Sequence, residues 1–127
     1  MKKFLMLVAM VFGAMPASAQ AAGPYDGIWA ATYQGSPIGY FSAHENNGTI
    51  VVAMLPADRS DWEAFIGQRN NNTASLATIV SDASTTISVT FISTTTFTAT
   101  QISCVPKQSG ARCLFPDGAV FQGNKIF

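Results

Sequence analysis

The chain has 127 residues, with seven Lys and Arg, seven Asp and Glu and one His, so its formal net charge at neutral pH is zero. This length suits one domain that buries a substantial core. Nucleic acids and anionic membrane surfaces are bound by clustered positive charge, which this composition lacks, so we expect neither as a partner.

The N-terminal residues have the three zones of a secretory signal peptide. Lys2 and Lys3 precede an apolar run over residues 4–14, and the small residues Ala17-Ser18-Ala19 follow it. A membrane anchor is the alternative, but it needs roughly twenty apolar residues. We therefore expect a signal peptide over residues 1–19, a single domain over residues 20–127, and a periplasmic or secreted location.

The first strand of the predicted domain opens with Gly27-Ile28-Trp29. Here the chain resembles the calycins, the lipocalin and avidin group, whose first strand begins with Gly-x-Trp. The resemblance implies a small β-barrel in which Trp29 closes one end and the open end binds a small ligand. No ligand-contacting residue is carried over from the family. Trp29 is also explained as an ordinary core aromatic.

Turn-forming residues recur at short intervals and separate runs of β-branched and aromatic residues. Asn47-Gly48 is the sharpest turn signal, because both residues tolerate positive φ. Residues 58–67 could hold a helical turn, and we favour a strand there. We expect eight or nine strands, near 27–33, 38–44, 49–55, 62–69, 73–80, 85–92, 95–105, 111–115 and 119–126.

This succession of short strands predicts an all-β fold. Open sheet edges invite aggregation, so the strands are expected to close on themselves or to pack as two sheets. We therefore predict a small antiparallel meander barrel, possibly flattened to a sandwich. Alternation is clearest at Ile87, Val89 and Phe91, which should share the buried face of one strand.

Three aromatic residues with polar tips are the candidate ligand-binding residues: Tyr33, Tyr40 and Trp62. Tyr and Trp combine an apolar ring with a hydrogen-bonding group, which suits the mouth of a cavity. We expect them to face a cavity mouth or an interface, and packing in the core is the alternative for each of them.

No set of catalytic residues can be identified in the sequence, and we expect a protein that is not an enzyme. His44 and Glu45 are adjacent, so in a strand their side chains point to opposite faces. Asp58, Asp61 and Glu63 lie close together without the spacing of a calcium loop, which indicates a solvated acidic loop. We expect no cofactor and no metal.

Cys104 and Cys113 are the two cysteines of the chain. An even number of cysteines in an exported protein indicates a disulfide. A metal site would need more soft ligands nearby. We expect the bond to join neighbouring arms of one hairpin.

The segment between the cysteines contains Ser109-Gly110-Ala111-Arg112. It looks like the Ser-Gly-x-Arg-Tyr loop of the periplasmic inhibitors of C-type lysozyme, although Cys113 stands in the place of Tyr. The resemblance implies a loop that inserts into a lysozyme cleft and binds it through Ser109. The plainer interpretation, which we favour, is a disulfide-braced hairpin tip with Lys107 and Arg112 beside it. Together, Lys107, Ser109 and Arg112 form the candidate partner-binding loop.

Phe127 at the C-terminus is typical of outer-membrane barrels. However, membrane-spanning strands need roughly ten residues, and several strands expected here are shorter. Lys125 would also share a face with Phe127, where such barrels need an apolar residue, so we expect no stable membrane insertion.

From the sequence we expect an exported, soluble β-barrel that acts by binding a small apolar molecule or another exported protein. The alternative is a structural or self-assembling protein. This alternative is indicated by the small number of charged residues and by the strands rich in Thr, Ser and Asn.

Overall fold

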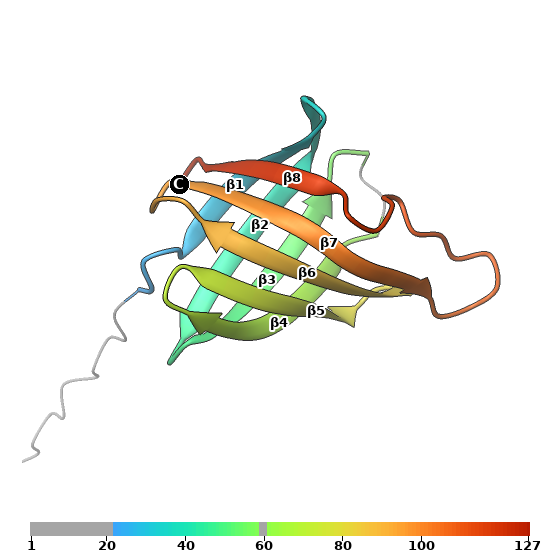
Figure 1. The fold of residues 1–127 in the computed structure, drawn as a ribbon, viewed down its shortest axis with the longest axis horizontal. Helices are drawn as coiled ribbons and strands as arrows, with labels where there is room; N and C mark the ends of the chain where they lie inside the picture. The colour runs from blue at the N-terminus through green and yellow to red at the C-terminus, as the bar shows by residue number, and fades with distance from the viewer. Residues whose placement is uncertain (1–21, 59–60) are drawn as a thin grey trace, which may run out of the picture.

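The computed structural model describes residues 22–58 and 61–127, so the predicted signal peptide lies outside the described residues. Eight strands form one antiparallel sheet (Figure 1): β1 Gly27–Tyr33, β2 Ser36–Asn46, β3 Thr49–Pro56, β4 Glu63–Asn70, β5 Thr73–Val80, β6 Ala83–Phe91, β7 Thr96–Pro106 and β8 Val120–Lys125. Each strand pairs with the next, and β1 pairs with β8 from Trp29↔Lys125 to Tyr33↔Phe121. The predicted meander barrel is therefore confirmed, and it is a closed barrel.

The strand alternation decides which side chains fill the barrel. In β3, Ile50, Val52 and Met54 are buried, whereas Val51 and Leu55 are exposed on the outside. In β6, Val89 and Phe91 are buried and Ile87 lines the interior with them, as the sequence predicts. The register shifts at Ala31/Thr32, Ala64/Phe65 and Thr86/Ile87, and each shift leaves one extra residue in the partner strand: Ile38 in β2, Ile79 in β5 and Ile102 in β7.

Tight turns join most of the strands. The Asn47-Gly48 turn between β2 and β3 has φ angles of 50° and 83°. Asn tolerates this left-handed conformation and Gly adopts it freely, which confirms the hairpin that the sequence predicts. Within residues 58–67 a strand begins at Glu63, as we favoured, and residues 59–60 lie outside the described residues. None of the described residues forms a helix long and apolar enough to cross a membrane.

The ninth strand expected over residues 111–115 is wrong. One edge of β7 pairs with β6 as far as Ala83↔Pro106, and its other edge pairs with β8 from residue 96 to residue 100. Residues 107–119 therefore form a long connection between β7 and β8, which passes the end of the barrel before returning to β8 (Figure 1).

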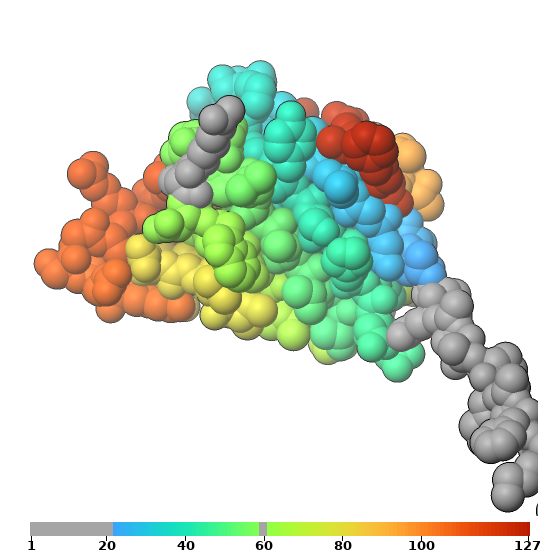
Figure 2. Space-filling view, turned by 180° about the vertical axis from the view of Figure 1, so that it is seen from behind, coloured from blue at the N-terminus to red at the C-terminus, as the bar shows by residue number. Residues whose placement is uncertain are grey.

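The barrel has two different ends. We call one the closed end, where the turns 47–48, 71–72 and 92–95 lie together with the segment 22–26. We call the other the mouth, where the β1–β2, β3–β4 and β5–β6 connections lie together with the loop 107–119. Figure 2 shows part of this loop, in orange, projecting beyond the body of the molecule.

Candidate functional site

Packed aromatic side chains fill the closed end. Trp29 in β1 is 1% exposed, and its indole Nε1 donates a hydrogen bond of 3.0 Å to the backbone oxygen of Tyr25. The Tyr25 ring stacks on Phe91 with 3.8 Å between the ring centroids, and Phe97 packs beside Trp29 at 5.5 Å. The ammonium group of Lys125 lies 5.6 Å from the Trp29 ring centroid. This end therefore has little room for a ligand.

An ion pair braces the same end. Arg69 in β4 donates two hydrogen bonds to Glu45: one from Nε to Oε2 at 2.7 Å and one from Nη2 to Oε1 at 2.5 Å. The Arg69 guanidinium also lies 5.6 Å from the Tyr25 ring centroid. The hydrogen bond to Glu45 raises the pKa of Arg69 above its ordinary value, so the guanidinium remains charged.

The loop 107–119 is tied to the mouth by several contacts. A disulfide joins Cys104 in β7 to Cys113 in the loop, with 5.9 Å between their Cα atoms. The side-chain nitrogen of Gln101 donates a 2.8 Å hydrogen bond to the backbone oxygen of Phe115. The Phe115 ring lies 5.0 Å from both Tyr33 and Phe121, measured between ring centroids.

The disulfide is confirmed, but its expected position is not. Cys113 lies in the loop and not in a strand, so the bond does not join two arms of a hairpin. Instead it fastens the loop to the end of β7. Because Cys104 and Cys113 both line the barrel interior, the bond is also part of the wall of the cavity described next.

The interior of the barrel contains a cavity of about 110 Å³ between the closed end and the mouth. Trp29, Phe91 and Phe97 line it on the side of the closed end, and the loop residues from Arg112 to Phe115 line it on the side of the mouth. Its wall is mostly apolar and comes from strands all around the barrel; it includes Phe41, Val52, Met54, Phe65, Leu76, Ala83, Ile87, Val89, Ala99 and Phe121.

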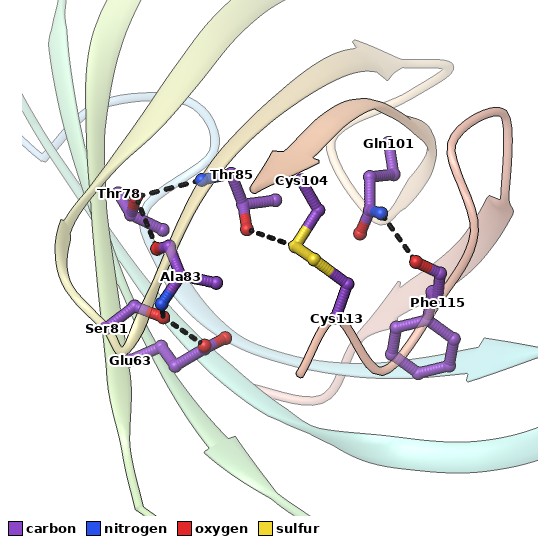
Figure 3. Close-up of a disulfide and its surroundings, with 9 residues drawn as sticks. All are labelled: Glu63, Thr78, Ser81, Ala83, Thr85, Gln101, Cys104, Cys113 and Phe115. Carbon is purple, nitrogen blue, oxygen red and sulfur yellow. Dashed lines mark hydrogen bonds between the residues drawn. A yellow bond between two sulfur atoms is a disulfide. The ribbon is translucent and has the colours of Figure 1, made fainter. Parts of the chain in front are cut away.

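Four polar side chains also line this cavity: Glu63, Thr85, Gln101 and Arg112. Figure 3 shows the first three of them around the disulfide. The Thr85 hydroxyl donates to Cys104 Sγ at 3.4 Å, while Gln101 is occupied by its bond to Phe115. The Ser81 hydroxyl donates to a carboxylate oxygen of Glu63 at 2.6 Å. In the described part of the chain, every fully buried polar side-chain atom has a hydrogen-bond partner.

The three predicted ligand-binding aromatics do not come together. Tyr33 is half-buried at the mouth, where it packs on Phe115 and Phe121. Tyr40 is 54% exposed on the outside of β2, and Trp62 is 56% exposed in the β3–β4 connection. Tyr33 is thus the one of the three that packs against the cavity wall, although it does not itself line the cavity.

The predicted partner-binding residues all lie at the mouth and are exposed. Lys107 donates from Nζ to the backbone oxygen of Ser81 at 3.1 Å, and its backbone nitrogen donates to the backbone oxygen of Asp82 at 2.9 Å. Ser109 lies in the part of the loop that projects outward, and Arg112 lies where the loop meets the cavity. The loop therefore combines a protruding tip with a base that belongs to the cavity wall.

Sequence reasoning missed the polar residues of the cavity. The sequence predicts Glu63 in a solvated loop with Asp58 and Asp61, but Glu63 is the first residue of β4 and lies two positions before the buried Phe65. The period of two in a strand could have placed it on the inner face. Thr85 and Gln101 also follow the period of two, Thr85 in phase with Ile87 and Val89 in β6 and Gln101 in phase with Ala99 in β7, so the same argument could have placed them inside.

His44 and Glu45 point to opposite faces, as the sequence predicts. The His44 ring is exposed and shares a 3.1 Å hydrogen bond with Ser42, whereas Glu45 points inward to Arg69. Within residues 22–58 and 61–127, no group of three or more His, Cys, Asp or Glu side chains is placed to hold a metal ion. The arrangement found is a small apolar space with a carboxylate at its edge.

No protein-family model, no curated protein and no solved structure matches this chain. The resemblances to calycins and to lysozyme inhibitors therefore depend only on the residues quoted for them above.

Proposed function

We propose that this chain is a binding protein that holds a small apolar molecule inside the barrel, on the mouth side of Trp29. The observation that carries the proposal is the cavity of about 110 Å³, because side chains that were selected only to fill a core leave few voids larger than a water molecule. Its mostly apolar wall with a few polar groups is typical of small-molecule sites.

The size of the cavity limits the ligand. An apolar protein cavity of roughly 150 Å³ holds one benzene molecule, and the cavity here is smaller. The buried part of the ligand should therefore contain only a few heavy atoms. A longer ligand would have to displace the loop 107–119, which the disulfide, Gln101 and Phe115 hold against the mouth.

We also propose that the protein works outside the cytoplasm, in the periplasm or as a secreted protein. The disulfide between Cys104 and Cys113 supports this location, because disulfides persist in oxidising compartments and are rare in the reducing cytosol.

Tryptophan fluorescence can test the binding proposal. The chain has two tryptophans, and in a Trp62→Phe variant only Trp29, which lines the cavity, remains. Titration of this variant with 1-butanol should change the Trp29 emission with saturation and should raise the unfolding temperature, since a ligand that binds the folded state stabilises it. A linear, non-saturating response without a shift in the unfolding temperature would contradict the proposal.

A second candidate function is docking of the loop 107–119 on another exported protein. The observation that favours it is a protruding loop that a disulfide holds in place, because bracing reduces the entropy that a loop loses on docking. The resemblance at Ser109 and Arg112 proposes C-type lysozyme as the partner. Inhibition of lysozyme by the wild type, weakened by Ser109→Ala and by Arg112→Ala, is the expected result. Equal inhibition by both variants, or none by the wild type, would contradict this candidate.

A further inference from the structure

The carboxylate of Glu63 is held in a fixed orientation at the edge of the cavity. The Ser81 hydroxyl accepts a 3.1 Å hydrogen bond from the backbone nitrogen of Ala83 and donates its own proton to Glu63 Oε1 at 2.6 Å. The other oxygen, Oε2, makes no hydrogen bond to a described residue. In Figure 3 it points away from Ser81, toward the side where the disulfide lies. Glu63 therefore offers one preorganised acceptor to a group in the cavity.

Arg112 is the other charged residue that lines the cavity, and its setting is different. It belongs to the loop and is exposed, whereas Glu63 is half-buried at the start of β4. Ion pairs of exposed side chains contribute little free energy, because water screens the two charges. The same attraction is stronger where burial lowers the local dielectric. A charged ligand group should therefore gain more binding free energy from an interaction with Glu63 than from one with Arg112.

The described residues of the mouth have a net charge of the same sign as Glu63. Among the described residues at this end, five acidic side chains stand against two basic ones, Lys107 and Arg112. The acidic residues are Asp58, Asp61, Glu63, Asp82 and Asp117. A mouth with this excess of negative charge attracts cations and repels carboxylates.

We propose that the natural ligand is a short apolar molecule with a primary ammonium group, and that Glu63 Oε2 accepts a hydrogen bond from this group while the apolar part lies in the cavity. This inference rests on the proposed small-molecule binding and specifies its chemistry. A primary ammonium is compact and carries three donors, which suits a single oriented acceptor beside a cavity of about 110 Å³.

Three probes of equal chain length test the inference: n-butylamine, 1-butanol and butyrate, titrated at neutral pH into the full chain carrying Trp62→Phe. Hydrogen bonds to charged groups contribute about 1.5–3 kcal/mol, so n-butylamine should bind roughly tenfold or more tightly than 1-butanol. Butyrate should bind more weakly than 1-butanol. The readout is Trp29 emission, checked by the shift of the unfolding temperature.

Two variants separate the local role of Glu63 from the general charge of the mouth. Glu63→Gln keeps an oxygen that can accept from Ser81 and removes the charge; it should reduce the preference for n-butylamine over 1-butanol to about twofold or less. Asp117→Asn removes the same charge at the mouth from an exposed residue that does not line the cavity, and it should keep most of the preference.

Each outcome has a distinct meaning. Three results would show that the ammonium inference is wrong while the binding proposal stands. The three probes could bind equally, or butyrate could bind best. Alternatively, Glu63→Gln and Asp117→Asn could lower the affinity for n-butylamine equally. If no probe gives a saturable change, the cavity does not bind small molecules, and both proposals fall together. A preference for n-butylamine that disappears only in Glu63→Gln supports the inference.

Discussion

The two ends of this barrel are built from the same strands but differ in how their polar groups are used. At the closed end, the indole nitrogen of Trp29 is bonded to Tyr25, and the charge of Arg69 is paired with Glu45. At the mouth, Glu63 keeps one carboxylate oxygen without a partner among the described residues beside an apolar cavity. Satisfied polar groups stabilise a fold, whereas an oriented group with remaining capacity can bind a ligand.

The difference between the ends follows from where the large aromatics and the long loop lie. Trp29, Phe91 and Phe97 are positioned near the closed end by their strands and pack against one another. The mouth is instead covered by the loop 107–119, which contributes Leu114 and Phe115 but leaves a cavity below them. Substitutions at the closed end should therefore change stability, and those at the mouth, apart from loss of the disulfide, should mainly change binding.

The largest effect is expected for Trp29→Ala. Replacing a buried aromatic by Ala typically costs about 3–5 kcal/mol of unfolding free energy, from lost burial and from the cavity that remains. Chemical denaturation of wild type and variant measures this cost. Trp62→Ala is the matched control, because Trp62 is 56% exposed; its cost should be within about 0.5 kcal/mol. Equal costs at the two positions would show that the closed end is not specially stabilised.

The paired variant Cys104→Ser with Cys113→Ser should have the next largest effect. Closing a loop with this short sequence separation stabilises a fold by about 2–3 kcal/mol according to the chain-entropy estimate. Because the bond fastens the loop over the cavity, the variant should also bind 1-butanol more weakly. Denaturation and Trp29 titration measure the two effects. Lower stability with unchanged binding would show that the loop is not part of the site.

Arg69→Met tests the ion pair of the closed end. The change leaves the carboxylate of Glu45 without its partner in a side chain that is only 7% exposed. We expect a loss of about 1–3 kcal/mol, the range for leaving a buried polar group without its hydrogen-bond partner. Because the pKa of Arg69 is raised, stability that depends on its charge is present at neutral pH and is lost only as the pH rises through that pKa. The wild type should therefore not lose this contribution in mildly alkaline solution, which thermal unfolding over that range can check.

The smallest effect is expected at the tip of the loop. Ser109 is exposed and has no hydrogen bond to a described residue, so Ser109→Ala should change the unfolding free energy by no more than about 0.5 kcal/mol. It should also leave the affinity for 1-butanol unchanged, because Ser109 does not line the cavity. A marked loss of stability would mean that the tip packs against the barrel.

The sequence predicts the barrel well because its signals are local. Asn47-Gly48 marks a turn, and the alternation of Ile87, Val89 and Phe91 identifies an inner face, so both are visible within a few residues. The strand expected over residues 111–115 is wrong because this segment pairs with no neighbouring strand; the disulfide and the Gln101–Phe115 hydrogen bond hold it at the mouth instead. Strand pairing is set by the whole barrel and leaves no local signal.

The candidate site was much harder to predict than the fold. Residue type alone makes Tyr40 and Trp62 candidates, but their exposure depends on strand register and on the β3–β4 connection. Glu63, Ser81 and Ala83 come from two strands and the turn before the second, and they become a site only through their hydrogen bonds. The cavity itself arises from the combined volume of side chains around the barrel, which no short sequence pattern records.

The most direct test of the account is to fill the cavity and measure binding of 1-butanol by Trp29 emission. Ala83 and Ala99 are buried and line the cavity, so Ala83→Leu or Ala99→Leu should place apolar atoms where the ligand would lie. Ala77→Leu adds the same side chain on the exposed face of β5 and is the matched control. The account predicts that the inner variants fold but lose saturable binding, while Ala77→Leu binds as the wild type does. Undiminished binding by both folded inner variants would contradict it.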